Sequence, residues 1–272
     1  MDTQRTIEEG CVGKVIAVCN QKGGVGKTTT AINLAACLAA AEKNTLIIDM
    51  DPQANTTIGL GIDKDEPEST IYDVLTQHLK GDKPLLALND IIFSCDSIRY
   101  LDIAPAAPDL AGAEIELVNA MARERQLDHA LEAVRQNYEY LIIDTPPSLG
   151  LLTINTLTAA DSVLIPIQCE YYALEGLAEL LNTIRLVQKS LNKRLVIEGA
   201  LLTMYDNRLN LSRQVAEDVR SYFKGKVFKA VIARNVKLSE SPSFGKPIIL
   251  YDIMSSGAEN YLNLAKEIME NE

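Results

Sequence analysis

The chain has 272 residues, of which 47% are hydrophobic and 23% are charged, and its formal net charge is −11. This length and composition are typical of one large α/β domain with a sizeable buried core. The acidic balance disfavours a nucleic-acid-binding domain that is basic throughout, but screening over ~8–10 Å still permits a local basic patch. No apolar run reaches the ~18–20 residues that a membrane span needs, and residues 1–13 lack the apolar core of a signal peptide.

Seven short apolar runs rich in β-branched residues predict strands. They span residues 14–20, 45–50, 100–106, 140–147, 162–168, 196–204 and 229–234. Most of them are continuously apolar rather than alternating, which is typical of parallel strands that are covered on both faces.

Helical patterns separate these runs. They lie at residues 28–43, 116–137, 177–191, 212–223 and about 259–269. Strand and helix in alternation predict right-handed crossovers and an α/β fold with a doubly wound, mostly parallel sheet and helices on both faces. Ligands of such folds bind at the carboxyl ends of the strands.

The predicted organisation is a short N-terminal arm over residues 1–13 followed by one domain over residues 14–272. Residues 62–70 are acidic and contain a proline, and they predict a surface loop that opens an excursion to about residue 97. We interpret that excursion as an insertion within the domain. The arm is expected to be a disordered tail or a partner contact.

A glycine-rich segment, CNQKGGVGKTT at residues 19–29, follows the first predicted strand and opens the first predicted helix. This is the context that a phosphate-binding P-loop requires. Gly23, Gly24 and Gly26 permit backbone angles and a close approach that a Cβ would block. The backbone N–H groups of such a turn, with the helix N-terminus behind them, form a concave site for phosphate oxygens.

Three side chains at the end of this loop have predicted roles. Lys27 is expected to reach the β- and γ-phosphates of a nucleotide, Thr28 to ligate Mg²⁺, and Thr29 to bond a phosphate nearer the sugar. Lys22 has no role within a single P-loop, so its simplest interpretation is a solvated surface lysine.

Carboxylates end two predicted strands. Asp144 follows a buried run and is expected to hold Mg²⁺. Asp49 and Asp51 stand at the end of another strand, which Pro52 terminates. Hydrolysis needs a group that orients or deprotonates water, and Asp51 is the candidate. The alternative interpretation of Asp51 is a turn-forming Asp-Pro pair.

These motifs together resemble a known family. KGGVGKTT at residues 22–29 resembles the deviant Walker A motif of the ParA/MinD group of P-loop ATPases. DMDPQAN at residues 49–55 resembles the second motif of that group, and residues 142–161 resemble its Walker B region. The likeness runs from about Lys14 to Lys266 and is strongest to the chromosome-partitioning ParA/Soj proteins.

The resemblance implies a Mg²⁺-dependent ATPase that is cytoplasmic and associated with the nucleoid. ATP would join two subunits into a sandwich homodimer, in which Lys22 reaches the partner's phosphates. The dimer would bind double-stranded DNA without sequence preference, and a ParB/Spo0J-like partner would stimulate hydrolysis and release it. Some relatives also act on the replication initiator, and stable membrane association is not expected.

The resemblance also assigns site residues. Catalysis falls to Lys22, Lys27 and Asp51, and the metal to Thr28, Asp51 and Asp144. Nucleotide binding falls to the loop and two distant asparagines: Lys22, Gly23, Gly24, Val25, Gly26, Lys27, Thr28, Thr29, Asn207 and Asn235.

One departure from the family concerns the residue two before Asn235. Family members usually have proline where this chain has Ala233. A backbone contact to the nucleotide survives that change, whereas the rigidity of a proline is lost.

The resemblance assigns DNA binding to Arg208, Arg234 and Lys237. Independently, residues 208–237 concentrate basic side chains and contain only two acids. The alternative is a solvated helix face and loop. Lys237 often corresponds to arginine in relatives, and a phosphate contact tolerates that exchange.

Three other functions remain as alternatives. A MinD-like membrane-cycling ATPase would need a basic amphipathic C-terminal helix, whereas this chain ends in an acidic segment. An iron–sulfur ATPase would need cysteines such as Cys95 and Cys169, which we interpret as structural. A sequence-specific transcription regulator would need more than the 13 residues before the first strand for its helix-turn-helix module.

Overall fold

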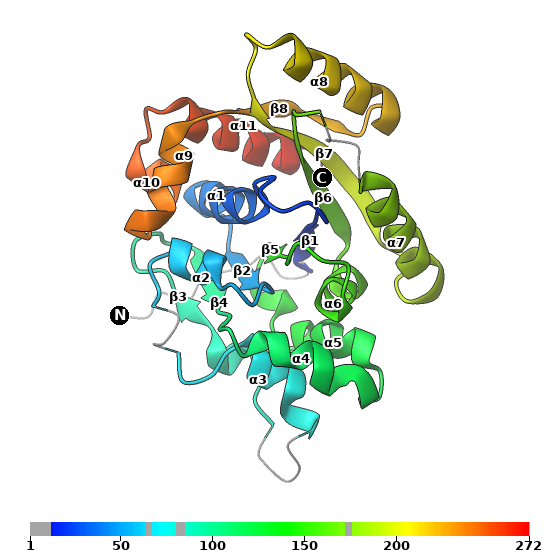
Figure 1. Cartoon of the computed structure of the whole chain (residues 1–272). Helices are drawn as coiled ribbons and strands as arrows, with labels where there is room; N and C mark the ends of the chain where they lie inside the picture. The colour runs from blue at the N-terminus through cyan, green and yellow to red at the C-terminus, as the bar shows by residue number, and fades with distance from the viewer. Residues whose placement is uncertain (1–11, 64–66, 80–84, 172–175, 272) are drawn as a thin grey trace.

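The computed structural model describes residues 12–63, 67–79, 85–171 and 176–271 (Figure 1). Eight strands form one sheet in the order β3-β4-β2-β5-β1-β6-β7-β8. Their bounds are β1 Lys14–Val18, β2 Thr45–Asp49, β3 Phe93–Ser94, β4 Leu101–Ala104, β5 Tyr140–Asp144, β6 Ser162–Gln168, β7 Val196–Tyr205 and β8 Val227–Ala233.

The mostly parallel, doubly wound sheet is confirmed. All seven predicted strands are present, and every pairing is parallel except that of β3 with β4. β3 is only two residues long and was not predicted. β1 lies between β5 and β6. On one side of it the chain forms β2, β3 and β4 before β5 fills the place beside β1, and on the other side β6, β7 and β8 follow in order. This arrangement puts the loop after β1 at the centre of the carboxyl edge, where ligands of doubly wound sheets bind.

Helices cover both faces of the sheet (Figure 1). Buried residues of α1, α9, α10 and α11 pack on one face, and buried residues of α3 to α8 pack on the other. The α-helices are α1 Lys27–Ala40, α2 Asn55–Gly59, α3 Ile71–Thr76, α4 Leu110–Glu116, α5 Gln126–Glu132, α6 Leu151–Ala159, α7 Leu177–Ser190, α8 Asn210–Phe223, α9 Val236–Glu240, α10 Ile248–Tyr251 and α11 Ser256–Glu270.

This two-sided cover explains why the strand sequences are continuously apolar. In β1, Val15 and Ala17 belong to the core on one face, while Ile16 and Val18 belong to the core on the other. All four side chains are fully buried. A strand with one wet face would instead alternate polar and apolar residues.

The continuous helix predicted over residues 116–137 was wrong. α4 ends at Glu116, α5 covers only Gln126–Glu132, and short 3₁₀ turns lie between and after them. Ala122 adopts a left-handed φ of 50°, which breaks the helix. The break is stabilised by Asn155 of α6, whose amide donates to the Arg123 carbonyl at 2.8 Å and accepts the Leu127 N–H at 3.2 Å.

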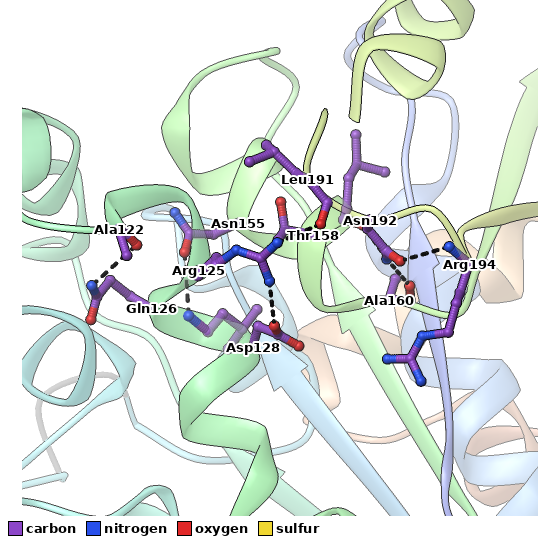
Figure 2. A network of polar contacts seen from close by, with 12 residues as sticks. Ala122, Arg125, Gln126, Asp128, Asn155, Thr158, Ala160, Leu191, Asn192 and Arg194 are labelled. Atoms are coloured by element: carbon purple, nitrogen blue, oxygen red, sulfur yellow. Dashed lines mark hydrogen bonds and ion pairs between the residues drawn. The ribbon is translucent and has the colours of Figure 1, made fainter. Parts of the chain in front are cut away.

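Figure 2 shows Asn155 together with a second buried asparagine, Asn192. Asn192 follows α7 and donates to the carbonyls of Leu157 and Ala160 at the end of α6. Its side-chain oxygen accepts the Arg194 N–H. Buried amides therefore join α6 to α5 and to the turn before β7, where apolar packing alone would leave backbone groups unpaired.

The predicted excursion at residues 62–97 contains more structure than a loop. α3 lies within it, and Thr70 begins that helix with a capping box that includes Asp73. Most of the predicted N-terminal arm, residues 1–11, lies outside the described residues.

Candidate active site

The glycine-rich loop joins β1 to α1 at the centre of the carboxyl edge. Gly24 and Gly26 adopt φ angles of 73° and 87°, in the left-handed region that glycine enters without steric cost. A Cβ added at Gly23 or Gly24 would meet no described atom within 4 Å. Gly26 leads directly into α1, which has no side-chain cap among the described residues. The turn therefore leaves open space beside Gly23 and Gly24, at the N-terminus of α1, and such a space suits a phosphate.

Two residues that the sequence analysis passed over hold the start of this loop. The Asn20 amide donates to the Pro166 carbonyl in β6 at 2.7 Å and accepts the backbone N–H of Lys22 at 3.0 Å. Gln21 donates to the Glu179 carboxylate in α7 at 2.7 Å. The Lys22 ammonium forms no hydrogen bond or ion pair with another described residue. The backbone of Lys22 is thus fixed while its side chain remains available.

Two more loop residues occupy defined places. Val25 is buried, and its carbonyl accepts the Thr203 hydroxyl at 2.9 Å. Lys27 is only 6% exposed, and its Nζ lies 3.4 Å from the Lys22 carbonyl. Burial lowers the pKa of Lys27, and the nearby carboxylates of Asp144 and Asp51 oppose that shift. The Lys27 ammonium therefore lies against the backbone of the loop. A phosphate bound there would stabilise its charged form further.

Asp144 ends β5 and is fully buried. Its Oδ2 accepts the hydroxyls of Thr28 at 2.7 Å and Thr56 at 2.8 Å. Its Oδ1 is buried and has no hydrogen-bond partner among the described residues. Burial raises the pKa of Asp144 to about 6, although both hydroxyl donors favour the ionised form. A buried carboxylate oxygen without a donor, beside a threonine hydroxyl, suits a hard cation such as Mg²⁺.

Asp49 lies next to Asp144 in the β2–β5 register. Its Oδ2 accepts the N–H and the hydroxyl of Thr57, and its Oδ1 accepts the N–H of Asp51. Burial raises the pKa of Asp49 to about 7, and the Asp144 carboxylate adds to the rise. Asp49 therefore ties the turn after β2 to α2 and leaves no oxygen free for a ligand.

Asp51 lies in that turn, beyond the end of β2, and is 6% exposed. Its Oδ1 accepts the Gln53 N–H at 2.9 Å, so the turn-forming role is present. Its charge also favours the ammonium form of Lys27 and raises the pKa of Asp144. The fold thus brings Lys27, Asp51 and Asp144 close enough together for their charges to interact.

A pocket of about 260 Å³ continues from the loop toward β8 and α9. Gly26 and Thr29 line one side of it, and Asn235 lies among the residues on the other. The Asn235 side chain caps α9 through the Lys237 N–H and donates to the Ser256 hydroxyl. A base in this pocket would therefore meet an asparagine that is already oriented by α9 and α11.

The second predicted asparagine occupies a neighbouring hollow. Asn207 lines it with Arg208 and Val236, and the two hollows share Ala233 and Arg234. The Ala233 N–H donates to Asn260 of α11 at 3.0 Å, a bond that proline could not make.

The three predicted DNA-binding cations are exposed, and each one meets a carboxylate. Arg208 forms two bonds to Asp206, at 2.9 and 2.7 Å. Arg234 meets Glu170 at 3.0 Å, and Lys237 meets Glu240 at 3.3 Å. Residues 208–237 contain few acids, but the fold brings these three carboxylates in from outside that stretch.

Comparison with known proteins identifies the chain's relatives. A family model described as an AAA domain matches residues 13–197. The sporulation initiation inhibitor protein Soj of Bacillus subtilis is 61% identical over 260 residues, which cover 96% of this chain and 100% of that protein. The chromosome partitioning protein ParA of Myxococcus xanthus is 58% identical, over 96% of this chain and 89% of its own.

The chain belongs to the ParA/Soj family of P-loop ATPases.

A solved structure extends the ParA/Soj comparison. A Mycobacterium smegmatis protein named cobyrinic acid a,c-diamide synthase was solved with ADP and magnesium. It is 35% identical, its alignment covers 95% of each chain, and its TM-score is 0.82. The cell division ATPase MinD of Pyrococcus furiosus is 25% identical, over 96% of this chain and 100% of its own, with a TM-score of 0.76.

The iron–sulfur alternative loses support within this ParA/Soj fold. Cys95 packs in the core on one face of the sheet and Cys169 packs in the core on the other. Burial raises the pKa of Cys95 to about 12 and that of Cys169 to about 11, which keeps both thiols protonated.

Proposed function

We propose that the chain is a chromosome-partitioning ATPase of the ParA/Soj type. The observation that carries this proposal is the buried Asp144 carboxylate, which is bonded to Thr28 at the mouth of the P-loop and has one oxygen without a donor. The identities of 61% and 58% to Soj and ParA support partitioning over the activity named for the 35% relative.

The loop residues would bind the phosphates of ATP through Gly23 to Thr29. Lys27 would neutralise the β- and γ-phosphates, and Thr28 and Asp144 would hold Mg²⁺, with Asp51 on the same side. When bound, Mg²⁺ would offset the charge that develops on the phosphate oxygens during transfer. Asp51 would orient or deprotonate the attacking water. Asn235, with Asn207 beyond it, would lie on the base side of the nucleotide.

Lys22 would act between subunits. Its backbone is fixed by Asn20, and its ammonium has no described partner that would have to be displaced. In an ATP-dependent sandwich homodimer, that ammonium would reach the phosphates held by the partner subunit. Lys22 and Lys27 would then neutralise the same nucleotide from two subunits.

The dimer would bind double-stranded DNA without sequence preference through Arg208, Arg234 and Lys237. Joining two copies doubles a patch that is weak in one subunit, because each phosphate contact adds salt-dependent affinity. A ParB/Spo0J-like partner would stimulate hydrolysis and release the dimer. We place this cycle in the cytoplasm, on the nucleoid, and extend it to control of the replication initiator.

A MinD-like membrane cycle is the alternative. The apolar side chains that α11 would offer to a lipid surface are already in the core, among them Tyr261, Leu264 and Ile268. A helix that lies on a membrane needs a free apolar face. Within the described residues, no helix combines the length and the apolar character needed to cross a bilayer. The packing of α11 therefore favours the partitioning cycle.

The test is ATP turnover measured alone, with DNA, with the ParB-like protein of the same genome, and with both. Partitioning predicts slow turnover alone and a clear rise when partner and DNA are present. The Lys27→Ala variant is the control for contaminating ATPase. Turnover that neither addition changes would contradict the partitioning proposal.

A further inference from the structure

Arg234 is neutralised by a carboxylate from a distant part of the chain. Its guanidinium bonds Glu170 at 3.0 Å, although the two residues are 64 positions apart. Glu170 follows β6, whereas Arg234 follows β8. The backbone N–H of Arg234 donates to the Tyr205 carbonyl at the end of β7. The pair thus bridges three strand ends at the carboxyl edge. Its side chains are 58% and 47% exposed, so solvent and other anions can reach both.

The other two pairs differ from this one because their acids also build local structure. Asp206 accepts the backbone N–H of Arg208 and so shapes the turn after β7. Glu240 lies one helical turn from Lys237 and accepts the Tyr251 hydroxyl at 3.0 Å. The Glu170 carboxylate has Arg234 as its only side-chain partner within the described part of the chain. Glu170 therefore has no evident structural duty besides this ion pair.

We propose that Glu170 is an internal competitor of DNA phosphate for Arg234 and thereby sets the affinity of the chain for DNA. This inference rests on the proposed DNA-binding function. Carboxylate and phosphate bind a guanidinium with the same geometry, so one guanidinium face holds one of them at a time. Glu170 occupies one N–H of the guanidinium, at Nη2, so a phosphate that binds Arg234 through that edge has to displace Glu170 and then lies beside a free carboxylate.

The pair is weak enough to tune binding rather than prevent it. Exposed ion pairs stabilise a protein by only ~0.2–1 kcal/mol, which corresponds to a factor of at most about five. In a chain of net charge −11, the freed carboxylate also adds to the repulsion of DNA. Removal of the Glu170 charge is therefore expected to tighten DNA binding by about two- to five-fold per subunit.

The experiment compares Glu170→Gln with the parent protein in its ATP-bound form, by fluorescence anisotropy on random-sequence duplex DNA at fixed low salt. Glu217→Gln is the matched control, because Glu217 is exposed on α8 and forms no ion pair with a described residue. Glu170→Gln is expected to bind DNA more tightly by about two- to five-fold for each subunit that contacts the duplex, and Glu217→Gln to change the affinity by much less.

A double-mutant cycle with Arg234→Gln separates competition from a general charge effect. In the Arg234→Gln background, the effect of Glu170→Gln is expected to fall to the small effect of Glu217→Gln, which measures general charge repulsion. Equal gains from Glu170→Gln and Glu217→Gln, or a gain from Glu170→Gln that is as large without Arg234 as with it, would overturn the inference while DNA binding itself stands. If the ATP-bound parent does not bind DNA at all, the proposed DNA-binding function fails and takes this inference with it.

Discussion

The hydroxyl of Thr56 tests how Asp144 is kept ionised at the candidate metal site. Thr56→Val removes the 2.8 Å hydrogen bond to Asp144 Oδ2 and leaves a side chain of similar shape in a fully buried position. Among the described residues, Asp144 then keeps the Thr28 hydroxyl as its remaining donor. The variant is therefore expected to be less stable, and the loss is expected to depend on pH.

The sign of this dependence follows from the pKa of Asp144. Burial raises that pKa to about 6 in the folded protein, whereas an unfolded aspartate titrates near ~3.9. A carboxyl group with a raised folded pKa takes up protons more readily in the folded state. The free energy of unfolding therefore falls as the pH rises between these two values. Thr56→Val removes a donor that favours the ionised form, so the fall continues to a higher pH.

The magnitude follows from the strength of the bond. A bond to a charged acceptor is worth about 1.5–3 kcal/mol and a neutral one ~1 kcal/mol. A difference of ~1.4 kcal/mol raises the folded pKa by about one unit. At pH 5, where Asp144 is protonated in both proteins, the expected loss of stability is ~1 kcal/mol. At pH 8 the expected loss is ~2.5 kcal/mol.

The assay is urea unfolding at pH 5 and pH 8, without nucleotide and with EDTA, so that no cation holds Asp144 ionised. Thr156→Val is the control, because that buried hydroxyl donates to the Leu152 carbonyl at 3.1 Å, which does not titrate. Its loss of stability is expected to be equal at both pH values. If Thr56→Val shows the same pH-independent loss, the reasoning about Asp144 is refuted.

Three further predictions concern the loop and Asp51. Lys22→Ala is expected to retain ATP binding but to lose ATP-dependent dimerisation in analytical ultracentrifugation, whereas Lys27→Ala is expected to lose nucleotide affinity or turnover. If Lys22→Ala dimerises as well as the parent protein, Lys22 is a solvated surface residue. Asp51→Ala is expected to bind ATP and stay on DNA as a dimer without hydrolysis, and retained phosphate release would remove Asp51 from catalysis. Gly24→Ala places a Cβ at a φ of 73° and is expected to cost ~1–2 kcal/mol of stability; a wild-type urea midpoint would show that this strain is absent.

The strands and the central site were predictable because their causes are local. A strand that is buried on both faces has a continuously apolar sequence, and a polar residue at the end of such a run indicates the carboxyl edge of the sheet. Asp49 and Asp144 end two of these runs, and the register places them side by side. The glycines of the loop predict backbone angles that other residues rarely adopt.

The features that the sequence did not predict depend on contacts between distant segments of the chain. Nothing near Ala122 is a glycine or a proline, so the helical pattern continued through a break that Asn155 stabilises from another helix. Thr56 resembles any other threonine until the fold places its hydroxyl against Asp144. Likewise, Arg234 acquires its counter-charge from Glu170, far outside the basic stretch that the sequence displays.

Lys22 shows how a residue with no use in one subunit still occupies a prepared position. The buried side-chain amide of Asn20 holds this part of the loop with both of its polar groups. Its NH₂ group donates to the Pro166 carbonyl of β6, and its oxygen accepts the backbone N–H of Lys22. The same two bonds fix the start of the phosphate-binding loop, so they also serve a single subunit. A lysine that must meet a phosphate held by another subunit needs a rigid base, because each free rotation at the base lowers the probability of contact. The anchoring of Lys22 by Asn20 therefore suits a contact between subunits, and it predicts that loosening Asn20 weakens dimerisation even when Lys22 is intact.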